Sequence, residues 1–88
     1  MRRGVRPPAA VLPVARVCVD VPLAHLDRPF DYLVPVDLDD QAVPGCRVRV
    51  RFAGQQVGGL LVERVAESAH DGRLDQLARV GAELAEPA

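Results

Sequence analysis

The chain has 88 residues, enough for one small domain that buries about 60–65% of the surface exposed by its unfolded form. A hydrophobic fraction of 49% with 26% charged residues is typical of a folded globular chain and excludes the disordered class. The 11 basic and 12 acidic residues leave a net charge of −1, which excludes a protein that binds polyanions by overall charge alone.

The N-terminal segment is rich in arginine and proline and shows neither strand nor helix periodicity. We therefore expect a flexible arm over 1–13 and a folded domain over 14–86. No apolar run reaches the ~18 residues of a membrane span, and the chain start lacks the apolar core of a signal peptide. We expect a cytoplasmic protein without membrane contact.

The first half of the chain predicts two strands. Alternating valines and polar residues over 14–21 form the first, and a short β-branched and aromatic run over 30–34 forms the second. A proline-containing loop over 22–29 separates them, because proline cannot donate to a sheet. Acidic residues over 37–40 then indicate a turn.

The clearest strand covers 46–52 and follows a Pro-Gly turn. Its apolar residues form one face, and the other face is a row of arginines: Arg47, Arg49 and Arg51. A turn over 54–56 leads into a strand rich in valine and leucine over 57–66. Within it, Gly58 and Gly59 indicate a bulge or a tight bend.

The last segment is ambiguous. After a turn over 70–72, the leucines of 74–84 fit one face of a helix, whereas Gly81 weakens a helix. Four strands separated by short turns nevertheless predict an all-β domain, either a small barrel or a sandwich.

Cysteine, lysine and histidine usage limits the chemistry. Cys18 and Cys46 have no neighbouring cysteine or histidine cluster, so we predict no metal site and no disulfide, and interpret both as small buried residues. All basic residues are arginines, which excludes a P-loop or Schiff-base lysine. His25 and Asp27 could form a catalytic pair, but no nucleophile accompanies them, and we interpret them as loop residues. No catalytic residue is therefore predicted, and the chain alone is not an enzyme.

Two sequence blocks carry a family resemblance. The stretch VPLAHLDRPFDYLVP, followed by PGCRVRVRFAG, resembles the N-terminal domain of primosomal protein N′, the replication-restart protein PriA. The resemblance covers about four-fifths of the chain. It implies a small OB-like, circularly permuted and partly open β-barrel.

The resemblance also implies a function. Such a domain captures the 3′-hydroxyl end of the nascent leading strand at a stalled or abandoned replication fork and helps to reload the replicative helicase. The implied partners are single-stranded 3′ ends and branched fork DNA, with other primosome proteins and single-stranded-DNA-binding protein as further partners of a nucleoid-associated monomer. Zinc and ATP belong to other regions of the family's proteins, which are ATP-dependent helicases in full, so no cofactor is expected here.

The resemblance assigns the binding residues one by one. The Phe-Asp-Tyr motif of the family falls on Phe30, Asp31 and Tyr32 and implies the pocket for the terminal nucleotide. A family glycine falls on Gly54 or on its neighbour Ala53, which implies a close approach of the backbone to the nucleotide.

A family lysine near the C-terminal end falls close to Ala78, and this chain has no lysine. Arg79 beside it is the implied substitute, although a planar guanidinium and an ammonium differ in shape.

The motif also has a chemistry of its own. Two of the chain's three aromatic residues flank Asp31, so base stacking worth ~1–3 kcal/mol is available beside a carboxylate. That carboxylate accepts a hydrogen bond from a free 3′-hydroxyl but repels an internal phosphate, which gives it a reason to select ends. In a regular strand, however, Phe30 and Tyr32 share one face and Asp31 points to the other. A joint site therefore needs irregular backbone, or only one of the two aromatic rings.

Two alternatives stay open. The aromatic residues of the motif could pack in the core, Tyr32 more readily than Phe30. The arginine row could follow a DNA backbone, or it could be a solvated face paired with acidic residues of the turn, namely Asp37, Asp39 or Asp40. The alternative function is a protein–protein interaction module without DNA-end recognition, in which the arginine row meets an acidic partner and the Phe-Asp-Tyr motif is structural.

Overall fold

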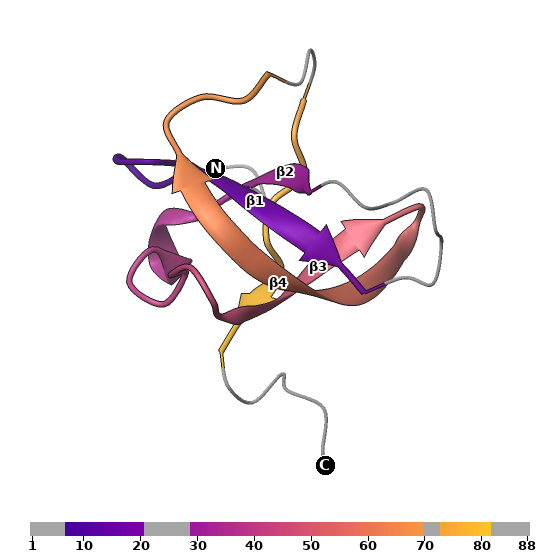
Figure 1. The fold of residues 1–88 in the computed structure, drawn as a ribbon. Coiled ribbons are helices and arrows are strands. Elements are labelled where there is room, and N and C mark those ends of the chain that lie inside the picture. Colours follow the sequence, from indigo (N-terminus) through magenta and orange to yellow (C-terminus); the bar gives the residue numbers. More distant parts are fainter. Residues whose placement is uncertain (1–6, 21–28, 70–72, 82–88) are drawn as a thin grey trace.

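The computed structural model describes residues 7–20, 29–69 and 73–81. It contains one antiparallel sheet of five strands in the order β2-β1-β4-β3-β5 (Figure 1). The strands are β1 (Val14–Val19), β2 (Phe30–Leu33), β3 (Arg47–Phe52), β4 (Gln55–Val65) and β5 (Arg79–Val80). The all-β prediction is confirmed, with an open sheet that does not close into a barrel. A single 3-10 turn, Val36–Leu38, is the only helical element in the described ranges.

The β3–β4 hairpin is tighter than predicted. Phe52 pairs with Gln55, so the connection is two residues long, and Ala53 and Gly54 both have positive φ, 52° and 81°. Positive φ at both central positions is typical of a type I′ turn, whose twist matches that of the flanking antiparallel strands. The turn expected over 54–56 therefore lies one residue earlier, and both glutamines belong to β4.

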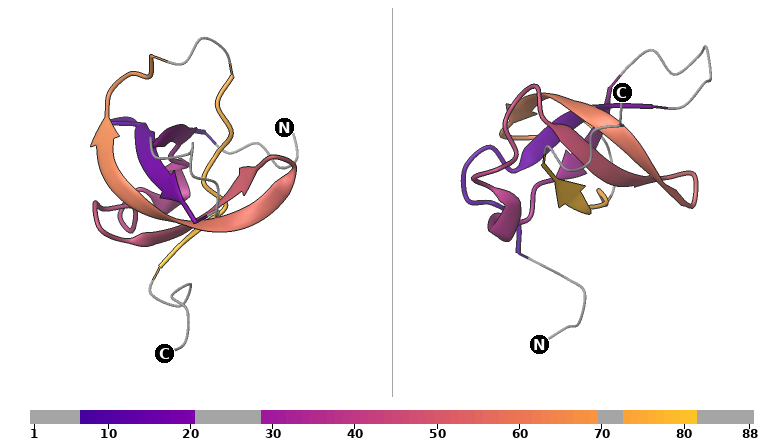
Figure 2. Two further views of the ribbon diagram at one scale, coloured as in Figure 1. Left: turned by 45° about the vertical axis from the view of Figure 1, so that its right-hand side comes forward. Right: turned by 90° about the horizontal axis from the view of Figure 1, so that it is seen from below.

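The long strand β4 is strongly curved and lies between β1 and β3 (Figure 2). Its register with β3 is regular, so the bulge expected at the glycine pair is absent there. The irregularity lies in the pairing with β1, between Arg16 and Val17. Gly59 has a different role, because a Cβ there would lie 2.7 Å from Val17 Cγ1 and 3.0 Å from the Cys18 carbonyl oxygen. It lets β1 and β4 approach closely.

The core follows the predicted alternation. Val17, Val48, Val50 and Leu61 are fully buried. The prediction of two buried cysteines is wrong: Cys18 is exposed and Cys46 is only half-buried. Cys18 lies between inward-facing valines on β1, so strand periodicity turns it to the outer face whatever its hydrophobicity.

The C-terminal segment is extended, which resolves the ambiguity between helix and strand. The amide of Leu33 donates to the Asp75 carbonyl, and the amide of Leu77 donates to the Leu33 carbonyl. Two residues later the chain forms β5, which pairs with β3. Leu77 is fully buried between these contacts. The segment therefore links the edge of β2 that faces away from β1 to the edge of β3 that faces away from β4.

Part of the predicted arm is attached to the domain. The Ala9 amide donates to the Val34 carbonyl at 2.8 Å, the Val36 amide donates to the Pro7 carbonyl at 2.8 Å, and Ala9 is buried. Residues 7–13 thus pack against the sheet, and the expectation of a free arm over 1–13 is wrong for this half. The physical reason is that the free backbone groups after β2 pair with the arm, which periodicity cannot reveal.

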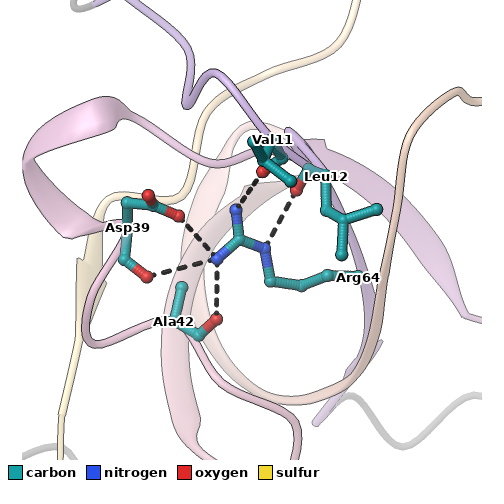
Figure 3. Close-up of polar contacts among 5 residues, drawn as sticks. All are labelled: Val11, Leu12, Asp39, Ala42 and Arg64. Atoms are coloured by element: carbon teal, nitrogen blue, oxygen red, sulfur yellow. Dashed lines mark hydrogen bonds and ion pairs between the residues drawn. The ribbon is translucent and has the colours of Figure 1, made fainter.

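Arg64 of β4 fixes this arrangement (Figure 3). Its guanidinium donates to the carbonyl oxygens of Leu12 and Val11 in the arm, at 2.9 and 3.0 Å. It also donates to the carbonyl oxygens of Asp39 and Ala42, both at 3.2 Å, and pairs with Asp39 Oδ1 at 2.8 Å. The side chain is only 11% exposed. One planar, always charged fork therefore joins three segments.

Several predictions concern residues outside the described ranges: the arm over 1–6, most of the loop over 22–29 with His25 and Asp27, the turn over 70–72, and the end of the domain after 81. No helix within the described ranges is long and apolar enough to span a membrane. In the same ranges, no group of three or more histidine, cysteine, aspartate or glutamate residues could hold a metal ion.

The Arg64 contacts generate a stability prediction. Arg64→Gln is expected to lower the free energy of unfolding by about 2–3 kcal/mol, because four carbonyl groups and a carboxylate lose a charged donor. Urea unfolding followed by circular dichroism measures it. Arg51→Gln is the control, since Arg51 is exposed and should change stability by less than ~0.5 kcal/mol. Equal effects of the two variants would contradict a structural role for Arg64.

Substitutions at Gly58 and Gly59 test how closely β1 and β4 approach each other. Gly59→Ala should destabilise the domain by ~1–3 kcal/mol, because its Cβ would overlap Val17 and the β1 backbone. Gly58→Ala is the control, since its Cβ would meet only side-chain ends of Arg47 and Asp20, at 3.4 Å. A smaller loss for Gly59→Ala than for Gly58→Ala in thermal unfolding would show that β1 and β4 are not held this closely.

Candidate nucleic-acid interface

A pocket of about 660 Å³ opens where β2, the β3–β4 turn and the segment 73–75 meet. Its size lies within the usual range of ~300–1,000 Å³ for small-ligand sites. Its walls are formed by Pro29, Phe30, Asp31, Tyr32, Arg51, Phe52, Ala53, Ala69, Arg73, Leu74 and Asp75. The pocket thus combines an apolar wall with two arginines and two aspartates.

All three aromatic residues of the chain line this pocket. Phe30 and Phe52 meet edge to face, with ring centroids 5.0 Å apart and an interplanar angle of 65°. This arrangement is favourable for aromatic pairs and keeps both rings in place. Both rings are only half-buried, so each retains surface for a ligand.

Tyr32 is a core residue as well as a pocket residue. It is 5% exposed, and its hydroxyl donates to the Arg51 carbonyl oxygen at 3.0 Å. Burial, with a smaller contribution from the nearby carboxylate of Asp75, raises the pKa of Tyr32 above its usual value. The motif aromatics therefore divide their roles, since Tyr32 supports the pocket and Phe30 offers the more accessible ring.

The backbone of β2 is regular through the motif, yet Asp31 still reaches the pocket. Leu33 directs its amide and carbonyl away from β1, toward Asp75 and Leu77. Strand alternation therefore directs the amide and carbonyl of Asp31 away from β1 too. At Asp31 the segment 73–75 borders the pocket instead of pairing with the strand, and no backbone partner for this peptide group occurs among the described residues.

The Asp31 carboxylate lies on the outer side of the same edge. Its Oδ2 accepts a hydrogen bond from the Ser68 hydroxyl, and its Oδ1 lies 3.7 Å from Nε of Arg16, the residue directly opposite on β1. Arg16 also binds Glu63 Oε2 at 2.8 Å. The Asp31 side chain is 15% exposed, so it is oriented by its neighbours while part of it still faces solvent.

The other assigned residues lie apart from the pocket. Gly54 does not line it. Its positive φ serves the turn, and a Cβ there would meet nothing within 4 Å, so no close approach explains this glycine. Arg79 does not line it either, but lies on β5 directly opposite Arg49. The expectation that Arg79 replaces the family lysine in the pocket therefore lacks geometric support.

The three arginines of the β3 row differ in their position relative to the pocket. Arg51 lines the pocket, whereas Arg47 and Arg49 do not. Arg47 forms an ion pair with Asp20 at the end of β1. The acidic turn does not neutralise the row by way of Asp39, because that carboxylate pairs with Arg64.

Sequence reasoning missed Phe52, Arg73 and Asp75. Phe52 could have been found as the third aromatic residue in a chain with so few. Arg73 and Asp75 lie next to a predicted turn and carry no pattern of their own. They reach the pocket because the C-terminal segment runs along β2, which is a tertiary contact.

Known proteins resemble this chain in sequence. A family model described as the 3′ DNA-binding domain (3′BD) of PriA matches residues 16–85. A probable replication restart protein PriA of Mycobacterium tuberculosis (strain H37Rv) is 57% identical over 56 residues, which is 64% of this chain and 8% of that protein. The homologue with the same name in Mycobacterium leprae is 54% identical over 56 residues, 64% of this chain and 9% of that protein. The matched segment thus covers less than a tenth of each of these curated relatives.

The buried tyrosine gives a pH prediction. Because the folded-state pKa of Tyr32 is raised, the unfolded chain ionises first, and stability present below pH ~10 is lost as pH rises through the folded pKa. The chain contains one tyrosine, so phenolate absorbance reports this group alone. Tyr32→Phe should remove the phenolate signal and lower stability at neutral pH by about 1 kcal/mol. A wild-type tyrosine that titrates like a free one would contradict this burial.

Proposed function

The chain belongs to the family of PriA 3′ DNA-binding domains, and from that premise we propose that its aromatic pocket holds the terminal nucleotide of a DNA strand that ends in a 3′-hydroxyl. The family is one of DNA-binding domains found in replication restart proteins, so this chain is a binding module rather than a catalytic one. The observation that carries the proposal is the meeting in one pocket of all three aromatic residues with Asp31, whose peptide group has no backbone partner among the described residues.

A nucleobase fits the two kinds of surface that the pocket offers. The half-buried rings of Phe30 and Phe52 provide stacking, worth ~1–3 kcal/mol per base. The amide and carbonyl of Asp31 offer one donor and one acceptor along the strand edge, and a base edge presents the same groups. Every base has such an edge, so the site accepts any terminal base.

The selection of ends rests on the Asp31 carboxylate. A terminal sugar can donate its 3′-hydroxyl to this group, whereas a strand that continues would place a phosphate against it. Arg16 and Ser68 hold the carboxylate in place, so it need not reorganise to accept the hydroxyl. End selection therefore follows from a fixed negative charge beside the base pocket.

The wider role is proposed on the same basis. A domain that recognises a 3′ end could capture the nascent leading strand on branched fork DNA, within a longer protein that helps to reload the replicative helicase. Contacts with primosome proteins or single-stranded-DNA-binding protein, and a monomeric state in the cytoplasm, belong to this proposal.

Binding to matched oligonucleotides tests the proposal. The domain is expected to bind a 3′-hydroxyl strand at least tenfold more tightly than the same strand with a 3′-phosphate, about 1.4 kcal/mol, by fluorescence anisotropy at one salt concentration. Asp31→Asn should lose much of this preference, because the charge is removed and the shape kept. Phe30→Ala should weaken both ends alike by ~1–3 kcal/mol, since stacking ignores the end.

Glu63→Gln is the matched control. It also removes a carboxylate bound to Arg16, but Glu63 does not line the pocket, so the preference for the 3′-hydroxyl should persist. Equal affinity of the wild type for both ends would refute end capture and favour the protein-interaction module.

A further inference from the structure

The outer faces of β3 and β5 carry a concentration of positive charge. Arg49 and Arg79 are directly opposite each other in the β3–β5 pair, and Arg51 lies two residues along β3 on the same face. Opposed residues of an antiparallel pair have Cβ atoms ~4.5–5.5 Å apart, and like charges so placed are unfavourable. The fold brings these cations together despite a net charge of −1.

Among the described residues, neighbouring acids do not relieve this repulsion. On the outer face of the sheet, Asp20 pairs with Arg47, whereas Glu63 and Asp31 share Arg16. No ion pair to Arg49, Arg51 or Arg79 occurs within the described ranges. Arg51 and Arg79 are exposed and Arg49 is half-exposed, so their guanidinium groups face solvent.

We propose that Arg49, Arg51 and Arg79 form a strip that binds the phosphates of the strand leading into the terminal-nucleotide pocket. The inference rests on the proposed function and deepens it, since it gives the path of the nucleotides that precede the 3′ end. Arg51 lines the pocket, so the strip begins there. Arg49 lies ~6.6–7 Å farther along β3, about one nucleotide away, and Arg79 widens the strip beside it.

Arg47 belongs to the arginine row of β3 but is not part of the strip. Arg47 has the same strand face, but its ion pair with Asp20 already satisfies its charge. A phosphate there would have to displace a carboxylate. The phosphate path therefore turns toward Arg79 instead of following β3 to its start.

Salt dependence tests the strip. The probe is a labelled oligothymidylate of about 12 nucleotides with a 3′-hydroxyl, within the usual site size of an OB-type domain. Each phosphate contact contributes ~0.7 to the slope of log affinity against log salt, so the triple variant Arg49→Gln/Arg51→Gln/Arg79→Gln should flatten the slope by about 2. Arg47→Gln is the matched control and should leave the slope unchanged. An equal slope for the triple variant and the wild type would overturn the strip.

A second measurement excludes a structural explanation. Neutralising Arg79 removes a like-charge contact, so Arg79→Gln should keep or raise the urea midpoint while lowering oligonucleotide affinity. Loss of affinity together with a lowered midpoint would overturn the assignment, because it would indicate damaged folding.

Further measurements distinguish failure of the arginine strip from failure of the terminal-nucleotide pocket. A 3′-hydroxyl dinucleotide should bind the double variant Arg49→Gln/Arg79→Gln as it binds the wild type, because the pocket is intact. If the triple variant flattens the salt slope but the wild type shows no preference for the 3′-hydroxyl, the strip is supported and end capture is refuted. If the wild type prefers the 3′-hydroxyl but the triple variant keeps the wild-type slope, only the strip is refuted. Arginine-dependent binding of oligoglutamate, with no binding of DNA, would overturn the strip and assign this face to an acidic protein.

Discussion

The candidate site depends on the curvature that brings β2 and β3 together, and the hydrogen bond from the Tyr32 hydroxyl to the Arg51 carbonyl marks this contact. It joins β2 and β3, which are not neighbours in the sheet, across the inner side of the curved layer. The same curvature brings Phe30 against Phe52. A flat sheet of the same strands in the same order would separate these two aromatic rings, and the pocket would lose a wall.

The C-terminal segment completes the site without closing the sheet. It pairs with β2 at Leu33 and with β3 through β5, but at Asp31 it borders the pocket instead of pairing. Full pairing along β2 would bond the Asp31 peptide and fill the pocket. Among the described residues, a partly open architecture thus leaves one donor and one acceptor unpaired on an edge strand, where most proteins cover or charge such groups. Here the uncovered edge is the proposed reading surface for a base.

Local patterns predicted much of this structure. The valines of β3 and the outward arginines followed strand periodicity, and the grouping of Phe30 with Asp31 followed from the motif. Long-range pairing could not be predicted in this way. The place of Arg79 depends on the register of a two-residue strand, and the Arg64 contacts go mainly to carbonyl oxygens, which have no sequence signature. Cys18 shows that strand alternation overrode hydrophobicity.

Amide chemical shifts in the ¹⁵N spectrum, recorded during titration with a 3′-hydroxyl dinucleotide, show directly whether the terminal nucleotide binds in this pocket. The amide of Asp31 faces away from β1 at the edge of β2 that borders the pocket, whereas that of Tyr32 faces β1 in the sheet. We expect the largest shifts at Asp31 and at the wall residues Arg73 and Asp75, with a smaller shift at Tyr32. Saturable shifts confined to residues outside the pocket, with Asp31 unmoved, would contradict it.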